Sequence, residues 1–382
     1  MKKILLCLFI FIIGISKVHA VTLAPKAKSA ILIEASSGEI IYESNMDEKR
    51  APASMTKMMS LVLIMEEIEN GNLKIDEEIK ISENAASMGG SQIYLEAGEI
   101  MTVNDLLKGI CMASANDAVV ALAERISGTE EEFVKRMNKK AKELGLTNTN
   151  FENSTGLDSD NHYSSAKDMA LIARELVKHD KILEYSSTFE DYLRQNTNKK
   201  FWLVNTNKLI KTYEGMDGLK TGFTESALYC LTATAKRNNM RLVGVIMGEP
   251  TSKERNEEMS SLLDYGFNNY EVTNLLEKGD TVEKYYNNKS SSLKTDVIVN
   301  EDINILNKKG KEKRNVTYEV KLDEKELPIK QNEVIGKLLV KENNKELFKV
   351  DVLSSKDIKK ANILELYIRN IGEFLNSKYI FN

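Results

Sequence analysis

A serine and a lysine three residues apart could carry acyl-transfer chemistry near the start of the chain. Ser54 and Lys57 open a long apolar run, within the stretch APASMTKMMS. On a helix this spacing puts both side chains on one face. Burial would lower the pKa of Lys57, so that a neutral amine could take the proton of the Ser54 hydroxyl. The spacing therefore predicts a nucleophile with its base one turn away, and the alternative is a serine that only caps the helix.

Short motifs of this kind are not specific on their own. S-x-x-K occurs three times, at Ser54–Lys57, Ser164–Lys167 and Ser291–Lys294. S-x-N also occurs three times, at Ser82–Asn84, Ser114–Asn116 and Ser159–Asn161. K-T-G occurs once, at Lys220-Thr221-Gly222. Of the S-x-x-K serines, only Ser54 opens a long apolar helix. Ser164 begins an amphipathic helix that it would cap, and Ser291 lies in a polar linker.

Two further motifs have a context that suits a catalytic cleft. Ser114 and Asn116 sit in a tight break between two apolar helical segments, where polar side chains can point into a cleft. K-T-G falls on a predicted strand, and its Gly222 leaves room for the backbone of a ligand to approach. Lys220 and Thr221 point to opposite faces of that strand unless it twists or ends there.

The composition and the first residues indicate where these motifs would act. The chain has 382 residues, with 42% hydrophobic and 29% charged residues, which favours two or three globular domains. Residues 1–20 have a basic start, an apolar core and a small residue at the end, which predicts a signal peptide cleaved after Ala20. The alternative is a retained anchor, but the apolar run Ile4–Ile15 is shorter than the ~18–20 residues that span a bilayer. We therefore expect a protein that works outside the cytoplasm.

Several functional classes do not fit the remaining composition. Removal of the signal peptide, with three lysines and no acid, takes the net charge from −4 to −7, which argues against nucleic acid as a partner. His162 and His179 lack the spacing of a zinc site, and no G-x-S-x-G motif is present. We therefore expect neither a metal nor a cofactor. Cys111 and Cys230 could form a single bridge, although two buried free thiols are the simpler interpretation.

The elements that must position the motifs are predicted to form one mixed domain. Residues 30–44 indicate a β-hairpin, and the run after Pro52 is apolar nearly all round, as in a buried helix. Helical spacing continues from Val103 to about His179, and three strand-like segments with a closing helix follow Trp202. The predicted fold class is α/β (mixed α+β), an antiparallel sheet with helices on both sides and a helical insert, over residues 21–274.

The composition becomes rich in lysine, asparagine and glutamate near Leu275. Residues 275–356 alternate between polar and apolar at period two, which predicts a small β-sandwich domain. Residues 357–382 return to helical spacing, with an apolar stripe made of Ala361, Leu364, Ile368, Ile371 and Leu375. This segment is too polar to span a membrane. It predicts an amphipathic helix that lies on the membrane surface, and the alternative is a helix packed on its own domain.

In order and context, the three motifs resemble those of penicillin-interacting serine enzymes. The chain is most similar to the low-molecular-mass penicillin-binding proteins that are serine-type D-alanyl-D-alanine carboxypeptidases. The similarity runs from about Ala30 to Tyr270 and includes GGSQIYLEAGE, DLLKGICMASANDA, STGLDSDNHYSSAKDMALIAREL, NTNKLI, GMDGLKTGFT and GEPTSKERNEE. The β-rich second domain and the amphipathic tail also fit the layout of that family.

This resemblance implies a β-lactamase/transpeptidase-like fold and a place at the outer face of the cytoplasmic membrane or in the cell wall of a bacterium. The implied substrate is the peptidoglycan pentapeptide stem that ends in D-Ala-D-Ala, and β-lactam antibiotics would be covalent inhibitors. Ser54 would attack the penultimate D-Ala carbonyl with Lys57 as its base. Ser114 would relay a proton to the leaving D-Ala amine, in a charge environment fixed by Lys220.

The resemblance also implies how the substrate is held. Asn116 would hold the substrate amide, and Thr221 and Arg255 would bind the terminal carboxylate, although Arg255 could equally be a solvated charge on a helix. Gly222 would belong to the same substrate-binding strand as Thr221. The backbone N–H groups of Ser54 and Phe223 would form the oxyanion hole. Some relatives have histidine where this chain has Phe223, which leaves the role of that side chain in substrate orientation or deacylation open.

Three rival functions share parts of this pattern. A β-lactamase would have all three motifs but also an E-x-x-L-N segment, and the candidates at Glu143 and Glu190 lack the asparagine. A non-catalytic wall-binding protein would be expected to lose Ser54, Lys57 or Lys220. An endopeptidase or transpeptidase on the same scaffold stays open, because the choice of acceptor depends on the shape of the cleft.

Overall fold

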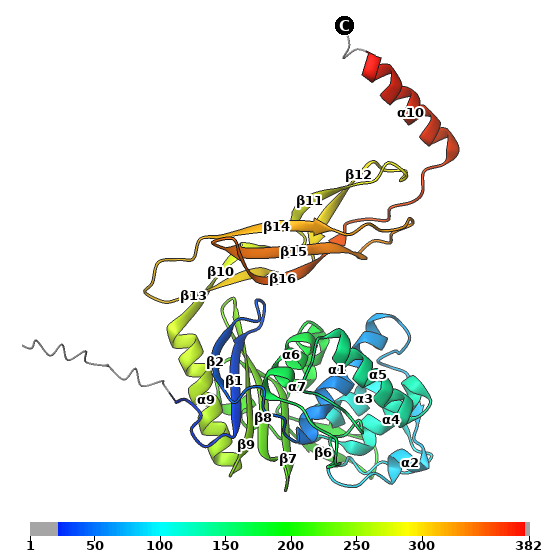
Figure 1. Cartoon of the computed structure of the whole chain (residues 1–382). Helices are drawn as coiled ribbons and strands as arrows, with labels where there is room; N and C mark the ends of the chain where they lie inside the picture. The colour runs from blue at the N-terminus through cyan, green and yellow to red at the C-terminus, as the bar shows by residue number, and fades with distance from the viewer. Residues whose placement is uncertain (1–21, 379–382) are drawn as a thin grey trace, which may run out of the picture.

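The protein is described by a computed structural model that covers residues 22–378, so the signal peptide predicted over residues 1–20 lies outside the described residues. Two lobes and a terminal helix follow one another along the chain, and the larger lobe contains all three motifs (Figure 1). The mixed fold predicted from the sequence is confirmed.

The larger lobe is built on a five-stranded antiparallel sheet with the order β2-β1-β9-β8-β7. Its strands are β1 (Ser29–Glu34), β2 (Ile40–Ser44), β7 (Met216–Thr224), β8 (Leu228–Arg237) and β9 (Met240–Glu249). The predicted hairpin over residues 30–44 and the predicted three-stranded meander are therefore confirmed. β7 lies at an edge of the sheet, so one side of the strand that contains K-T-G has no neighbouring strand of the sheet.

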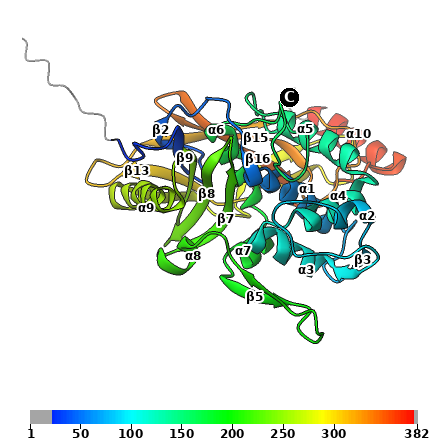
Figure 2. The same cartoon turned by 90° about the horizontal axis from the view of Figure 1, so that it is seen from below.

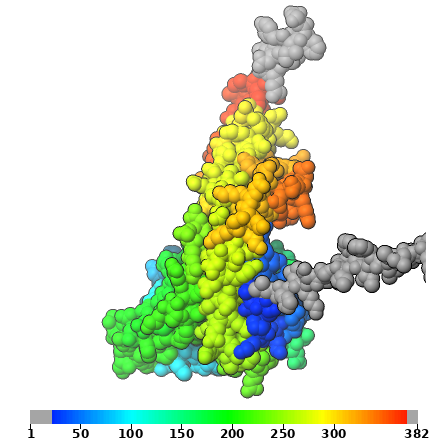
Figure 3. All heavy atoms as spheres, turned by 90° about the vertical axis from the view of Figure 1, so that its left-hand side faces the viewer, coloured from blue at the N-terminus to red at the C-terminus, as the bar shows by residue number. Residues whose placement is uncertain are grey.

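Both faces of the sheet are covered, as its sequence requires. Alternate residues of β1 belong to different cores: Ala30 and Leu32 pack with helix α9 (Ser252–Asn269), whereas Ile31 and Ile33 pack with the helical insert. Figure 3 shows α9 along the outer face of this lobe, below the second lobe. A strand buried on both faces is apolar without alternation, as the sequence AILI shows.

The helical insert lies between β2 and β7 and carries two of the three motifs. Its helices are η1 (Ala53–Thr56), α1 (Lys57–Glu69), α2 (Glu83–Ala86), α3 (Val103–Lys108), η2 (Gly109–Ala113), α4 (Asn116–Ser127), α5 (Glu130–Glu143), α6 (Ala166–Leu176), α7 (Asp180–Ser186) and α8 (Leu209–Thr212). Two small hairpins complete it, β3 (Glu78–Lys80) with β4 (Ile100–Thr102) and β5 (Glu190–Leu193) with β6 (Phe201–Val204).

The central helix of the insert is α1, and its burial was predicted. Every residue from Lys57 to Met65 is buried, which explains why this segment is apolar nearly all round. The predicted cap of the amphipathic helix α6 is wrong by one residue. The cap is Ser165, whose hydroxyl accepts from the Asp168 N–H, while the Ser164 hydroxyl hydrogen-bonds Thr149.

The second lobe consists of two packed sheets around a small core. Its strands are β10 (Tyr270–Leu276), β11 (Thr281–Tyr286), β12 (Lys294–Val299), β13 (Ile303–Lys308), β14 (Val316–Leu322), β15 (Val334–Glu342) and β16 (Lys345–Ser354). β10 pairs with β13, and the others form a sheet with the order β11-β12-β16-β15-β14. The predicted boundary between residues 274 and 275 falls inside β10.

The chain continues into helix α10 (Ile363–Lys378), which extends away from both lobes (Figure 1). Its first two turns leave Ile363, Leu364, Tyr367 and Ile368 more than 60% exposed. The Arg369 side chain donates to backbone carbonyls of the loop before β12. Within residues 22–378, no helix combines the length and the apolar character needed to cross a membrane.

Candidate active site

The serine and lysine of S-x-x-K meet at the junction of η1 and α1. Nζ of Lys57 lies 3.1 Å from Oγ of Ser54 and donates to the Thr155 carbonyl at 2.6 Å. Lys57 is fully buried, and burial together with the nearby charge of Lys220 holds its pKa well below the usual range. Ser54 does not act as a helix cap, because neither η1 nor α1 has a side-chain cap. The geometry therefore favours the nucleophile–base interpretation over capping.

The turn that presents Ser54 is strained and tightly enclosed. Ala53 has φ +47°, a left-handed conformation that costs a non-glycine residue roughly 1–2 kcal/mol. Two glycines allow other segments to approach this turn: a Cβ on Gly156 would lie 1.9 Å from the Ala53 carbonyl oxygen, and one on Gly222 would lie 2.9 Å from that of Pro52. Gly222 thus makes room for the protein's own backbone, beside any room it makes for a ligand.

A buried histidine ties the same turn to the loop before α6. His162 Nδ1 accepts from the Glu152 N–H at 3.0 Å, so its proton resides on Nε2, which lies 2.8 Å from the Thr56 hydroxyl. Burial lowers the pKa of His162 to about 4, which keeps the ring neutral at ordinary pH. The neutral histidine therefore connects the turn between Ser54 and Lys57 to the backbone at Glu152.

The second motif lies where helix geometry breaks. The π-helix η2 ends at Ser114, whose φ of +63° turns the chain sharply before α4 begins at Asn116. Oγ of Ser114 accepts from Nζ of Lys220 at 2.9 Å, so S-x-N and K-T-G are in direct contact. The predicted break between two apolar helices is confirmed, and its hydroxyl points toward the strand of K-T-G.

Asn116 is oriented by the neighbouring loop. Its amide nitrogen donates to the Gly89 carbonyl at 2.7 Å, while its buried Oδ1 has no partner among the described residues. Gly90 lets the two approach, because a Cβ there would lie 2.8 Å from the Asn116 amide nitrogen. An unpaired buried acceptor costs free energy, so Oδ1 is suited to receive an N–H group from a ligand.

The third motif provides a buried cation and a hydroxyl. Lys220 is fully buried, and burial lowers its pKa to about 7. Besides Ser114, its Nζ donates to the Thr221 carbonyl at 3.0 Å. The Thr221 hydroxyl lies 2.8 Å from that of Thr206. Both lysine and threonine thus serve one cleft although their side chains leave opposite faces of β7.

The motif residues open onto a cavity of about 330 Å³. Its lining residues come from η1, the loops around Ser91 and Thr206, the strands β7 and β8 and the start of α9: Ser54, Ser91, Ser114, Thr206, Lys208, Thr221, Gly222, Phe223, Tyr229, Ser252, Arg255 and Asn256. Of the predicted site residues, Lys57, Lys220 and Asn116 stand behind this lining.

Arg255 is a buried cation at this cavity, not a solvated helix charge. Only 5% of the residue is exposed, and within the described residues its guanidinium hydrogen-bonds only the neighbouring Asn256 side chain. Burial also lowers its pKa. A buried guanidinium without a carboxylate partner is suited to bind an anionic ligand.

Phe223 forms an aromatic edge to the same cavity. Its ring is 52% exposed and packs against Tyr229 of β8, with ring centroids 4.4 Å apart. Cys111 and Cys230 are both buried and free. The structure therefore favours the interpretation of two free thiols over a bridge.

Several contributors to the site were not predicted from the sequence. The Thr155 carbonyl that holds Lys57, the Thr206 hydroxyl and His162 all belong to segments that carry the family resemblance, STGLDSDNHYSS and NTNKLI. Their proximity to the motifs arises from tertiary contacts, and a backbone carbonyl leaves no mark in a sequence. Only the resemblance itself pointed to these segments.

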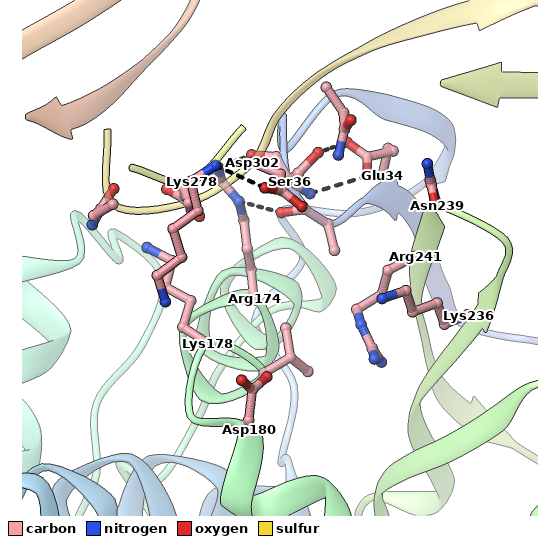
Figure 4. A pocket seen from close by; sticks show the side chains of 15 residues that line it. Glu34, Ser36, Arg174, Lys178, Asp180, Lys236, Asn239, Arg241, Lys278 and Asp302 are labelled. Atoms are coloured by element: carbon pink, nitrogen blue, oxygen red, sulfur yellow. Dashed lines mark hydrogen bonds between the residues drawn. The ribbon is translucent and has the colours of Figure 1, made fainter. Parts of the chain in front are cut away.

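A second cavity, of about 390 Å³, lies between the two lobes (Figure 4). Charges of both signs surround it, including Glu34, Arg174, Lys178 and Asp302. The Arg174 guanidinium donates to backbone carbonyls of the turn after β1, so it stabilises that turn. None of the motif residues lines this cavity, and the chemistry therefore belongs to the cavity at Ser54.

Comparisons with known proteins agree with this geometry. The family profile described as D-alanyl-D-alanine carboxypeptidase matches residues 16–251, and that of the penicillin-binding protein 5 C-terminal domain matches residues 270–360. The chain is 50% identical to D-alanyl-D-alanine carboxypeptidase DacF of Bacillus subtilis over 357 residues, which is 93% of this chain and 92% of the relative.

Two solved structures are similar to different shares of the chain. Penicillin-binding protein 5 from Haemophilus influenzae has a TM-score of 0.68 and 33% identity, covering 88% of this chain and 98% of its own. Penicillin-binding protein D2 from Listeria monocytogenes, in its ampicillin-bound form, has a TM-score of 0.57 and 32% identity, covering 63% of this chain and 98% of its own.

Proposed function

The chain belongs to the D-alanyl-D-alanine carboxypeptidase family of serine peptidases, and on this premise we propose that Ser54 is its nucleophile. As a serine carboxypeptidase of the bacterial cell wall, the enzyme acts on peptidoglycan and binds β-lactams. The proposed reaction removes the last residue of stems that end in D-Ala-D-Ala. It proceeds through an acyl-enzyme on Ser54, which water hydrolyses.

Acylation requires one proton to travel from the nucleophile to the leaving group. Neutral Lys57 takes the proton of the Ser54 hydroxyl as Oγ attacks the penultimate D-Ala carbonyl carbon, and a tetrahedral oxyanion forms. When the carbon–nitrogen bond breaks, Ser114 gives its proton to the leaving amine. Ser114 then recovers a proton from Lys220, which lies 2.9 Å from its Oγ, and the proton that Lys57 took from Ser54 replaces the one lost by Lys220. Free D-Ala leaves, and the acyl group stays on Ser54.

The substrate would lie along the free edge of β7. An extended peptide can pair with an exposed strand edge, and this strand brings Thr221 and Phe223 to the cavity. The N–H groups of Ser54 and Phe223 are the proposed oxyanion donors. Asn116 Oδ1 would accept an amide N–H of the stem, and the terminal carboxylate would meet Thr221 and Arg255.

One observation carries this proposal above the others. A fully buried lysine has its amine 3.1 Å from a serine hydroxyl that lines a cavity. Burial and the charge of Lys220 lower the pKa of this lysine, which favours the neutral state that a general base needs. A capping serine or a structural lysine would need neither the cavity nor the second lysine at Ser114.

The test is covalent labelling of the mature protein. We expect benzylpenicillin to add its mass to the wild type and to Ser291→Ala, a serine of another S-x-x-K, but not to Ser54→Ala. Wild-type enzyme should release D-Ala from a short peptide that ends in D-Ala-D-Ala. An adduct that persists in Ser54→Ala would refute the assignment. Chromatography that separates free D-Ala from cross-linked products distinguishes carboxypeptidase from transpeptidase or endopeptidase action.

We also propose a location for the enzyme at the outer face of the cytoplasmic membrane, after cleavage of residues 1–20. The exposed apolar side chains of α10 support it, because Ile363, Leu364, Tyr367 and Ile368 stay more than 60% exposed although other residues of the helix contact the second lobe. Vesicles of anionic phospholipid should bind the full mature chain but not a truncation before Asp357. Ile368→Glu, at a position 62% exposed, should weaken binding without loss of D-Ala release. Equal binding of all three proteins would refute the anchor.

A further inference from the structure

Exposed aromatic side chains lie on two joined segments, here called the ridge, that lead along the chain to the catalytic cavity. The ridge consists of the hairpin β5–β6 and the loop 91–99, and the hairpin projects from the molecule near β7 (Figure 2). Tyr94 is 68%, Trp202 is 57% and Tyr192 is 39% exposed. Tyr192 and Trp202 are direct cross-strand partners, so their side chains share the outer face of the hairpin. Trp202 is the only tryptophan of the chain.

This ridge is firmly held. Arg194 donates to both oxygens of Glu99 and to the Ile93 carbonyl, which joins the hairpin to the loop. Lys108 pairs with Asp191 at 2.7 Å and anchors the hairpin to α3. The inner side chains of the hairpin are buried in the main core of the lobe. The outer aromatic face is therefore presented on a rigid base, which reduces the entropy lost on binding.

The backbone of the loop is strained at the exposed residue Tyr94. Tyr94 has φ +57°, a conformation that costs a bulky residue roughly 1–2 kcal/mol. Its ring packs against Phe201, an inner-face residue of the hairpin, in a T-shaped arrangement with centroids 5.8 Å apart, and the residue stays 68% exposed. Strain that is not repaid by burial points to a role in binding.

The ridge lies close to the catalytic cavity along the chain. Ser91 and Thr206 line the cavity, and they precede Tyr94 by three residues and follow Trp202 by four. A chain of four residues spans at most about 14 Å, whereas an extended pentapeptide stem spans about 17 Å. A stem whose last residues lie at Ser54 can therefore bring its other end, which is attached to the glycan, to the ridge.

We propose that this ridge binds the glycan strand of peptidoglycan, a polymer of N-acetylated amino sugars. The inference rests on the proposed function, because it takes its ligand from the polymer that carries the stem. Pyranose rings present flat C–H faces that pack on aromatic rings, and Tyr192 and Trp202 offer such rings side by side. Lys199 and Lys200 lie on the same hairpin, where Lys200 stands 3.9 Å from the Tyr192 centroid and could donate to sugar hydroxyl or acetamido groups.

The first test compares two substrates. Release of D-Ala is measured on a short peptide that ends in D-Ala-D-Ala and on polymeric peptidoglycan with pentapeptide stems. The ratio of kcat/KM on polymer to that on peptide should fall about tenfold in Trp202→Ala, since one aromatic contact contributes about this factor. Trp202→Phe should keep most of the ratio. Tyr318→Ala, at an exposed tyrosine of the second lobe, should leave it unchanged.

An unchanged ratio in Trp202→Ala would overturn the proposal, and so would equal losses on both substrates, which would indicate a structural effect on the cavity. Failure of the proposed function would look different, because the wild type would then release no D-Ala from the short peptide.

The second test uses the single tryptophan as its reporter. Glycan strands stripped of their stems should shift the fluorescence of the wild type to shorter wavelength in a saturable way, and no shift would refute glycan binding.

Discussion

The proposed nucleophile, Ser54, depends on a glycine that lies about a hundred residues away in the sequence. Gly156 has φ +84°, and a Cβ added there would lie 1.9 Å from the Ala53 carbonyl oxygen and 2.4 Å from its carbon. Gly156→Ala therefore collides with backbone, which cannot rotate away as a side chain could. The added Cβ would clash with Ala53, the residue directly before Ser54.

The required displacement can be estimated from these contacts. Because Cβ contacts under 3.0 Å essentially do not occur, the Ala53 carbonyl or the loop must retreat by at least about 1.1 Å. Misplacement of a reacting group by about 1 Å can cost about a hundredfold in rate. The left-handed φ adds a separate penalty of roughly 1–2 kcal/mol to the free energy of folding. Acylation should therefore fall about a hundredfold, while the protein loses only part of its stability.

A matched control separates strain from collision. Gly128, at the end of α4, has φ +83° and nothing within 4 Å of an added Cβ. Gly128→Ala should lose a similar free energy of unfolding in urea but acylate with benzylpenicillin at the rate of the wild type. Stopped-flow acylation and urea unfolding of both variants decide the matter. If Gly156→Ala acylated within threefold of Gly128→Ala, the idea that this contact positions Ser54 would be wrong.

The charged and hydrogen-bonding groups around Ser54 make further predictions. Only neutral Lys57 accepts a proton, so the acylation rate falls as the pH falls through the pKa of Lys57. Lys220→Gln removes a charge that lowers this pKa, so the acidic limb of the pH–rate profile should move to higher pH. An unmoved limb would contradict the coupling of the two lysines. Arg255→Ala should lower kcat/KM about 30-fold on a peptide with a free C-terminal carboxylate relative to its amide, and an equal effect on both would exclude carboxylate binding. His162→Ala leaves the Thr56 hydroxyl and the Glu152 N–H without their partner and should lower the free energy of unfolding by about 2 kcal/mol in urea, with a smaller loss in His162→Gln.

The sequence was sufficient to identify the residues that carry the motifs, and the structure brings them together. Ser54 and Lys57 are three residues apart on one element, so their contact follows from helix geometry. The contact of Ser114 with Lys220 spans 106 residues, and only the order and context of the motifs, with the family resemblance, pointed to it. The buried helix α1 and the meander β7–β9 were predictable because their apolar patterns are long and uninterrupted.

The features that the sequence could not predict are mostly backbone contacts and short strands. The hairpin β5–β6 was missed because only four residues form each strand and the turn between them is polar. β10 was missed because none of its residues is fully buried, so its apolar side chains do not stand out. The burial of Arg255 could not be read from a helix start that carries many charges, since burial there depends on how α9 packs against β8 and β9. Close approaches such as that of Gly156 appear only once the chain is folded.

A site without a reacting histidine must still hold a neutral base and a cation at the same pH. Two buried lysines suit this need because burial and the charge of Lys220 both lower the pKa of Lys57. Lys57 is held by one carbonyl and faces the Ser54 hydroxyl, whereas Lys220, with a pKa of about 7, donates to Ser114 and to the Thr221 carbonyl. An anionic terminus bound beside Thr221 would favour the charge on Lys220, and that charge in turn favours neutral Lys57. Binding of the substrate and the protonation of the two lysines are therefore coupled. The coupling depends on the short distances that bring S-x-x-K, S-x-N and K-T-G together.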